Sequence, residues 1–73
     1  MREYEFTVIY EQDEDGVYVA RCPALHGCPT AGDTLEEARE LIADAMWLHI
    51  EVSLERGEPI PHEVAFHRVR VTV

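Results

Sequence analysis

The sequence predicts an α+β domain in which one long helix lies on one face of a small, mainly antiparallel sheet. Period-two alternation of apolar residues occurs near both ends of the chain, and a long helical pattern lies between capping signals at residues 34 and 57. The expected order is strand, strand, short strand, helix, strand, which is typical of an α+β domain. We expect residues 1–73 to form one domain.

The first two strands are predicted to form a hairpin. Tyr4, Phe6, Val8 and Tyr10 alternate with polar residues, as in a half-buried strand. A turn follows at residues 12–16, where Asp-Gly tolerates the positive φ of hairpin turns, and the chain returns over residues 17–22. After a stretch rich in proline and glycine, we expect a short third strand at residues 30–31.

The helix is predicted from about Leu35 to about Arg56. Thr34 and Glu37 form a T-x-x-E capping box, and Gly57 supplies the residue at which helices commonly end. A broad apolar arc should cover the sheet. Its members are Leu35, Ala38, Leu41, Ile42, Ala45, Leu48, His49 and Val52.

A second apolar stripe on the same helix exceeds what one sheet can cover. It consists of Ala43, Trp47, Ile50 and Leu54 and lies beside a solvated acidic side. We expect this stripe to mediate self-association into a dimer or tetramer, because exposed apolar patches commonly mark interfaces. The alternative is that the extended segment from Pro59 to Pro61 folds back over Trp47.

The last strand is predicted where Val69, Val71 and Val73 alternate with polar residues. Val64 and Phe66 are out of phase with these valines, so we expect a bulge or a strand start near His67. Because arginines flank the valines, this strand is a second candidate for pairing between copies.

Charge is the strongest compositional feature. Fifteen acidic residues against six basic ones give a formal net charge of −9, which opposes binding of nucleic acid by the chain alone. The same charge favours a basic protein partner, although acidity also simply keeps small domains soluble. No apolar run approaches a membrane span, and the acidic N-terminus is unlike a signal peptide, so we expect a cytoplasmic protein.

The stretch from Tyr18 to Ala38 resembles the HicB-like antitoxin family. The matching residues are Tyr18, Pro23, Leu25, Gly27, Cys28, Thr30, Gly32, Asp33, Thr34, Glu36, Glu37 and Ala38. Ala24 replaces an acidic residue of the family pattern, and His26 replaces a proline. A later part of the pattern matches at Leu54, Gly57, Ile60 and Pro61, so the resemblance covers nearly the whole chain.

This resemblance implies a partial ribonuclease H-like fold and an antitoxin that binds and blocks a small, basic, RNA-cleaving toxin of the HicA type. Full-length members often add a C-terminal DNA-binding domain of ribbon-helix-helix or helix-turn-helix type. We expect this chain to be the N-terminal-type domain only. We therefore do not expect it to bind operator DNA. A stand-alone member with a different partner remains the alternative.

Catalysis and metal binding are not expected, and no cofactor is predicted. Ribonuclease H chemistry needs several carboxylates converging on two metal ions, and no set in the sequence must converge. Cys22, His26 and Cys28 are metal-ligand types, but their spacing does not match zinc fingers, and both cysteines are expected to be reduced. A small metal-dependent nuclease derived from a ribonuclease H-like fold is the alternative function.

We therefore predict a protein-binding surface rather than an active site. Carboxylates are expected to set the association rate, and apolar residues the lifetime of the complex. The acidic members are Asp13, Glu14 and Asp15 at the hairpin and Glu40, Asp44 and Glu51 on the helix. The apolar members are Ala43, Trp47, Ile50 and Leu54. A solvated acidic helix face with no partner is the simpler alternative.

Overall fold

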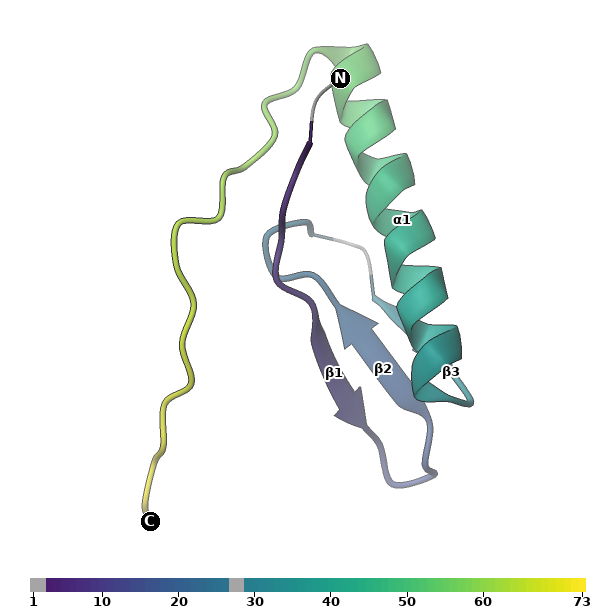
Figure 1. Cartoon of the computed structure of the whole chain (residues 1–73), viewed down its shortest axis with the longest axis vertical. Coiled ribbons are helices and arrows are strands. Elements are labelled where there is room, and N and C mark those ends of the chain that lie inside the picture. The colour runs from purple at the N-terminus through teal and green to yellow at the C-terminus, as the bar shows by residue number, and fades with distance from the viewer. Residues whose placement is uncertain (1–2, 27–28) are drawn as a thin grey trace.

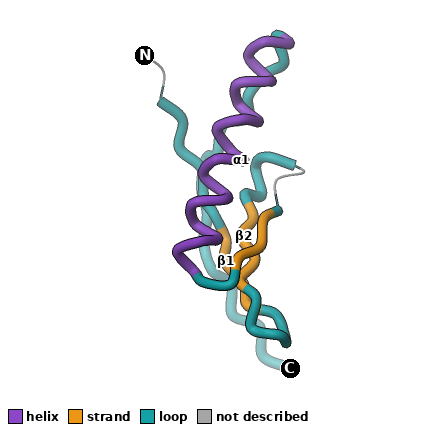
Figure 2. Tube along the Cα trace, turned by 90° about the vertical axis from the view of Figure 1, so that its right-hand side faces the viewer, coloured by secondary structure: helices purple, strands orange, loops and turns teal. Residues whose placement is uncertain are grey.

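The computed structural model describes residues 3–26 and 29–73. The elements follow in the order β1 (Ile9–Gln12), β2 (Tyr18–Arg21), β3 (Thr30–Gly32) and α1 (Leu35–Arg56). The three strands form one layer, and α1 lies across one of its faces (Figures 1 and 2). The α+β class, the antiparallel strands and the single long helix are thus confirmed.

The sheet is antiparallel, in the order β1-β2-β3. Ile9 lies opposite Arg21 and Gln12 opposite Tyr18, and the turn between them is held by the Asp13 carboxylate. Asp13 Oδ1 accepts hydrogen bonds from the backbone N–H groups of Asp15 at 2.9 Å and Val17 at 3.0 Å. The hairpin is confirmed, but β1 is shorter than predicted, because β2 ends opposite Ile9 and offers residues 3–8 no partner.

Helix α1 begins and ends where its capping residues predict. The Thr34 side chain accepts a hydrogen bond from the Glu37 N–H at 3.0 Å. At the other end Gly57 has a φ of 68°, and its N–H donates to the Leu54 carbonyl at 3.2 Å. Glu58 N–H bonds the Ser53 carbonyl at 2.9 Å, which completes a Schellman-type end.

The core lies between the sheet and one narrow strip of α1. Its buried apolar residues are Ala20, Cys22, Leu25, Ala38 and Ile42. Ala45, Met46 and Ile50 pack against this core from the helix. The predicted arc is therefore wrong in part. Leu35, Leu41 and Leu48 are 47%, 40% and 57% exposed, because three short strands cover only a narrow strip of the helix.

The predicted last strand is wrong for the structure as described. Beyond the extended segment at residues 59–61 the chain continues as an unpaired arm, which we define as residues 64–73 (Figure 1). Residues 63–66 face residues 5–7 across a hollow of about 500 Å³ instead of pairing with them. The observed order is therefore β-β-β-α, since the arm forms no ladder with the described strands.

Candidate protein-binding surface on α1

The outward side of α1 carries most of the predicted binding residues together. These residues recur along α1 at spacings of three or four, with Ala43 and Asp44 adjacent, so they share one side of the helix. They are Glu40, Ala43, Asp44, Trp47, Glu51 and Leu54. All six are exposed. The helix backbone fixes their spacing, because 22 residues of α-helix span roughly 33 Å.

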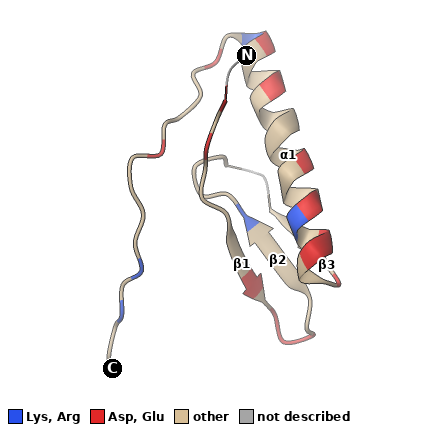
Figure 3. Ribbon diagram, viewed as in Figure 1, with Lys and Arg blue, Asp and Glu red and all other residues tan. Residues whose placement is uncertain are grey.

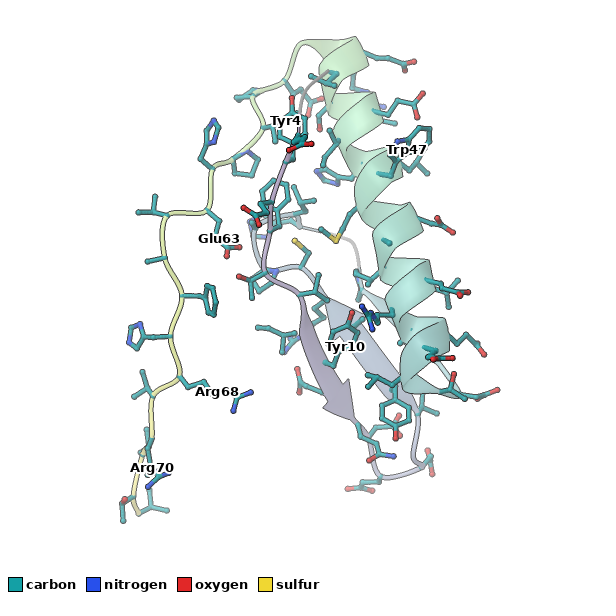
Figure 4. The ribbon with its side chains drawn as sticks, in the orientation of Figure 1. Tyr4, Tyr10, Trp47, Glu63, Arg68 and Arg70 are labelled. Atoms are coloured by element: carbon teal, nitrogen blue, oxygen red, sulfur yellow. The ribbon has the colours of Figure 1, made fainter. Side chains whose placement is uncertain are left out.

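The apolar part of this surface is the Trp47 flank, which we define as Ala43, Trp47, Ile50 and Leu54. Trp47 is 67% exposed and extends from α1 on the side away from the arm (Figure 4). A hollow of about 510 Å³ beside it is lined by Tyr4, Trp47, Ile50, Glu51 and Leu54. An exposed tryptophan beside a partly apolar hollow is the type of anchor that dominates protein interfaces.

Tyr4 belongs to this hollow but was absent from the predicted site. The sequence feature that could have identified Tyr4 is the alternation of Tyr4, Phe6 and Val8. This alternation places all three side chains on the face of the chain that points toward the helix. The segment Pro59–Pro61 is not among the residues that line the hollow, and Trp47 stays largely exposed. The alternative in which that segment folds back over Trp47 is therefore wrong.

The charged part of the surface is the acidic ridge, which we define as Glu40, Asp44 and Glu51. By helical spacing these carboxylates lie opposite Ala38 and Ile42, which pack on the sheet. Figure 3 shows acidic residues along much of α1. They are exposed, so their field extends into solvent and acts on an approaching partner over about a Debye length, roughly 8 Å at physiological salt.

A second apolar flank lies on the opposite side of the acidic ridge. Leu41 and Leu48 are exposed there, and Leu48 borders a hollow of about 380 Å³ with Ala45, Val52 and Arg56. The sequence pattern placed both leucines in the core, because a helical wheel cannot tell how wide a sheet will be. The acidic ridge is thus bordered by apolar side chains on both sides.

The hairpin carboxylates do not join this surface. Asp13, Glu14 and Asp15 are exposed at the tip of the turn between β1 and β2, in the sheet layer (Figure 2). The acidic ridge lies in the helix layer, so the structure separates the two predicted acidic groups. The Asp13 carboxylate also holds the turn, which gives it a structural role.

The described residues do not form a cluster that could bind a metal ion. No three of their histidine, cysteine, aspartate or glutamate side chains gather where they could hold a metal ion. Cys22 is buried and His26 is exposed, whereas Cys28, the third member of the predicted cluster, and Gly27 lie outside the described residues. The nuclease alternative therefore has no supporting group of carboxylates in this part of the chain.

One carboxylate has a perturbed acidity, and it lies where the arm begins. The Thr7 hydroxyl donates a hydrogen bond to Glu63, and the Thr7 N–H donates another at 2.8 Å. Both bonds stabilise the carboxylate, the hydroxyl bond more, and together they lower the pKa of Glu63. Glu63 points from the chain toward the sheet and ties the start of the arm to it (Figure 4).

The family model described as HicB_like antitoxin of bacterial toxin-antitoxin system matches residues 6–71. The chain belongs to the HicB-like antitoxin family. It is 45% identical over 60 residues to a UPF0150 protein of Synechocystis, which covers 82% of this chain and 76% of that protein. A UPF0150 protein of Thermoplasma acidophilum is 44% identical over 61 residues, 84% of this chain and 88% of that one.

A third HicB-like relative, a UPF0150 protein of Archaeoglobus fulgidus, is 40% identical over 62 residues, 82% of this chain and 90% of that one. No solved structure matches the chain. Within the described residues, α1 is too polar to cross a membrane. Membership of the HicB-like family makes the surface on α1 a candidate site for a toxin partner.

Proposed function

We propose that this protein is an antitoxin that binds and neutralises a small, basic, RNA-cleaving toxin of the HicA type. The observation that supports it best is the outward side of α1, where the Trp47 flank lies directly beside the acidic ridge. A family of antitoxins needs a protein-binding surface, and this is an exposed apolar surface with a charge opposite to that of a basic toxin.

The two parts of the surface act differently in this proposal. The acidic ridge attracts the toxin and raises the association rate, because complementary charges steer diffusing partners. The Trp47 flank is then buried and desolvated in the contact with the toxin. This burial slows dissociation of the complex, as aromatic anchors usually do. The hairpin carboxylates add to the long-range field from the sheet layer.

The protein acts by occupying the toxin's active site, and it has no catalytic function of its own. We place this action in the cytoplasm, where RNA substrates of such a toxin occur. Without a partner the chain does not bind nucleic acid, because a net charge of −9 repels phosphate backbones. Submicromolar binding to duplex DNA or RNA at physiological salt would contradict this part of the proposal.

We also propose that the protein is a homo-oligomer and that residues 1–73 fold as one domain. The predicted order ends in a fourth strand, and β1 and β3 are the edges of the described sheet. The valines at 69, 71 and 73 have the alternation that such a strand needs. They can extend either the sheet of their own chain or the sheet of a second copy.

The test is inhibition of RNA cleavage by a basic HicA-type toxin. We expect the full chain to abolish cleavage at about one antitoxin domain per toxin. Trp47→Ala should weaken binding by about 2 kcal/mol, roughly 30-fold, as hot-spot truncations do. Leu48→Ala is the matched control, because Leu48 is also an exposed apolar residue of α1 but lies across the acidic ridge.

Cleavage that continues with a tenfold excess of the chain contradicts neutralisation of that toxin. Equal losses in the two variants would contradict the assignment to the Trp47 flank and leave neutralisation itself intact. The nuclease alternative is tested in the same assay without toxin, since divalent-metal-dependent cleavage of an RNA–DNA hybrid by the chain would show catalysis.

A further inference from the structure

We propose that the arm is an exchanged strand: residues 64–73 of each copy add to the outer edge of β1 in a second copy of the chain. The proposal deepens the self-association proposed above and does not depend on the toxin. The apolar side chains of the arm are exposed to solvent. Val64, Phe66, Val69, Val71 and Val73 are between 71% and 118% exposed, so half of the arm consists of large apolar residues in water.

The whole chain exposes far more surface than a closed monomer. Its accessible area is 6371 Å², whereas a folded monomer of 8.4 kDa exposes about 4,600 Å². The excess is about 1,800 Å², more than the roughly 800 Å² that each partner buries in a standard interface. The radius of gyration of 13.9 Å likewise exceeds the roughly 11 Å of a compact chain of this length. The structure is therefore that of a chain lacking a neighbour.

The position at which the arm starts does not bring its valines beside β1 of their own sheet. The bonds from Thr7 to Glu63 fix where the arm starts, and the arm runs in the same direction as β1 (Figure 1). In that register residue 68 lies opposite Gln12, the last residue of β1. Residues 69–73 would pass roughly 16 Å beyond the strand at 3.3 Å per residue, beside the turn. The three valines therefore have no sheet of their own to pair with.

The apolar side chains of the arm also change face. In an extended segment Val64 and Phe66 point to one side, and Val69, Val71 and Val73 point to the other. A single sheet covered by a helix on one face buries only one of these sides. Covering the other side needs an apolar surface that the chain's own sheet does not provide.

Charge favours another copy as the occupant. The arm contains Arg68 and Arg70 and no acidic residue, so it contributes +2 to a chain whose total is −9, and residues 1–63 carry −11. The edge that would receive it continues from Glu11 into Asp13, Glu14 and Asp15. The arm is thus the basic segment of an acidic protein, complementary to the β1 edge (Figure 3).

The receiving edge is open. In the described structure β1 is an edge strand, paired only with β2, and its outer N–H and C=O groups face away from the sheet. Ile9 and Tyr10 on it are 40% and 38% exposed, one on each face of the sheet. Unpaired edges of this kind recruit strands from other chains. Reciprocal exchange gives a dimer with two-fold symmetry and leaves the Trp47 flank free for a toxin.

The test uses the full chain. Sedimentation equilibrium at tens of micromolar should give twice the 8.4 kDa mass of the chain. The double variant Val69→Asp/Val71→Asp should sediment at the single-chain mass and keep its helical circular dichroism, because both side chains are exposed in the free chain. Leu48→Asp is the matched control on an exposed apolar residue elsewhere, and it should keep the doubled mass.

Isotope-filtered NMR on a mixture of labelled and unlabelled chain then identifies the contact. We expect nuclear Overhauser effects between the methyl groups of Val69 or Val71 in one copy and Ile9 in the other. A single-chain mass for the unmodified protein, a doubled mass in the arm variant, or contacts between arm and β1 only within one chain would each overturn the proposal. None of these readouts involves the toxin, so failure of neutralisation is a separate result.

Discussion

Gly32 shows how a single residue holds the two layers together. In the sequence Gly32 breaks regular structure and matches the family pattern, and in the structure it is the buried last residue of β3, against the start of α1. A Cβ at this position would lie 2.7 Å from the Ala38 backbone nitrogen and 3.1 Å from the Glu37 Cβ. Backbone atoms cannot move aside as a flexible side chain can.

Gly32→Ala should therefore lower the free energy of unfolding by roughly 1–3 kcal/mol, as overpacking does. Thermal unfolding followed by circular dichroism measures it. Gly57→Ala is the comparison, because its Cβ would meet nothing and only the positive φ of 68° costs energy, about 1 kcal/mol. A Gly32→Ala protein as stable as the parent would show that β3 does not need this close approach to α1.

Glu63 gives the arm a pH dependence. Its pKa in the folded chain is lowered by the Thr7 hydroxyl and N–H, so the ionised form is the one that holds the contact. The stabilisation is complete above the ordinary glutamate pKa of about 4.3 and is lost as the pH falls through the lowered folded value. The Thr7 amide resonance should shift with a midpoint below pH 4.3. Glu63→Gln should abolish that titration, and a midpoint at or above 4.3 would contradict the contact.

At the level of elements, the ends of α1 could be predicted and its buried face could not. Thr34 and Gly57 specify the ends through local backbone hydrogen bonds, which depend only on neighbouring residues. Which side is buried depends on the sheet, and here its width leaves Leu41 and Leu48 exposed while Met46 and Ile50 pack on the core. The Trp47 flank and the acidic ridge followed from the helical spacing, and the second apolar flank was missed because the width of the sheet is not encoded in α1.

The N-terminal cap of α1 should contribute measurably to the stability of the fold. Thr34→Ala removes the side chain that accepts the Glu37 N–H, which should cost about 1 kcal/mol. For a chain of 73 residues this corresponds to a fall in Tm of roughly 4–8 °C. Thr34→Ser keeps the hydroxyl and should keep the Tm within about 1–2 °C of the parent, since serine and threonine cap almost equally. Equal losses in both variants would show that packing, not capping, sets the effect.

For the whole molecule, the sequence predicted a fourth strand but could not tell where it would pair. Alternation at Val69, Val71 and Val73 indicates a strand with one apolar side, and nothing local decides between its own sheet and another. Only the short β1 and the contact between Thr7 and Glu63 restrict that choice. The charge, by contrast, was evident from composition, and it is the basis of the electrostatic steering proposed above.

Association with a basic HicA-type toxin should therefore depend strongly on salt. Raising salt from about 0.05 M to 0.5 M should slow association at least tenfold, because screening shortens the range of steering. The triple variant Glu40→Gln/Asp44→Asn/Glu51→Gln should slow association at low salt and leave dissociation nearly unchanged. Trp47→Ala should do the reverse.

The matched control removes the same charge from the hairpin in the sheet layer, so it tests whether the location of the charge matters. It is the triple variant Asp13→Asn/Glu14→Gln/Asp15→Asn. Asparagine at position 13 retains an oxygen that can accept the turn's hydrogen bonds. We expect the ridge variant to slow association more than the hairpin variant, because only the ridge adjoins the Trp47 flank. An association rate that ignores salt would defeat electrostatic steering, and equal effects of the two triple variants would show that net charge, not the position of the ridge, attracts the toxin.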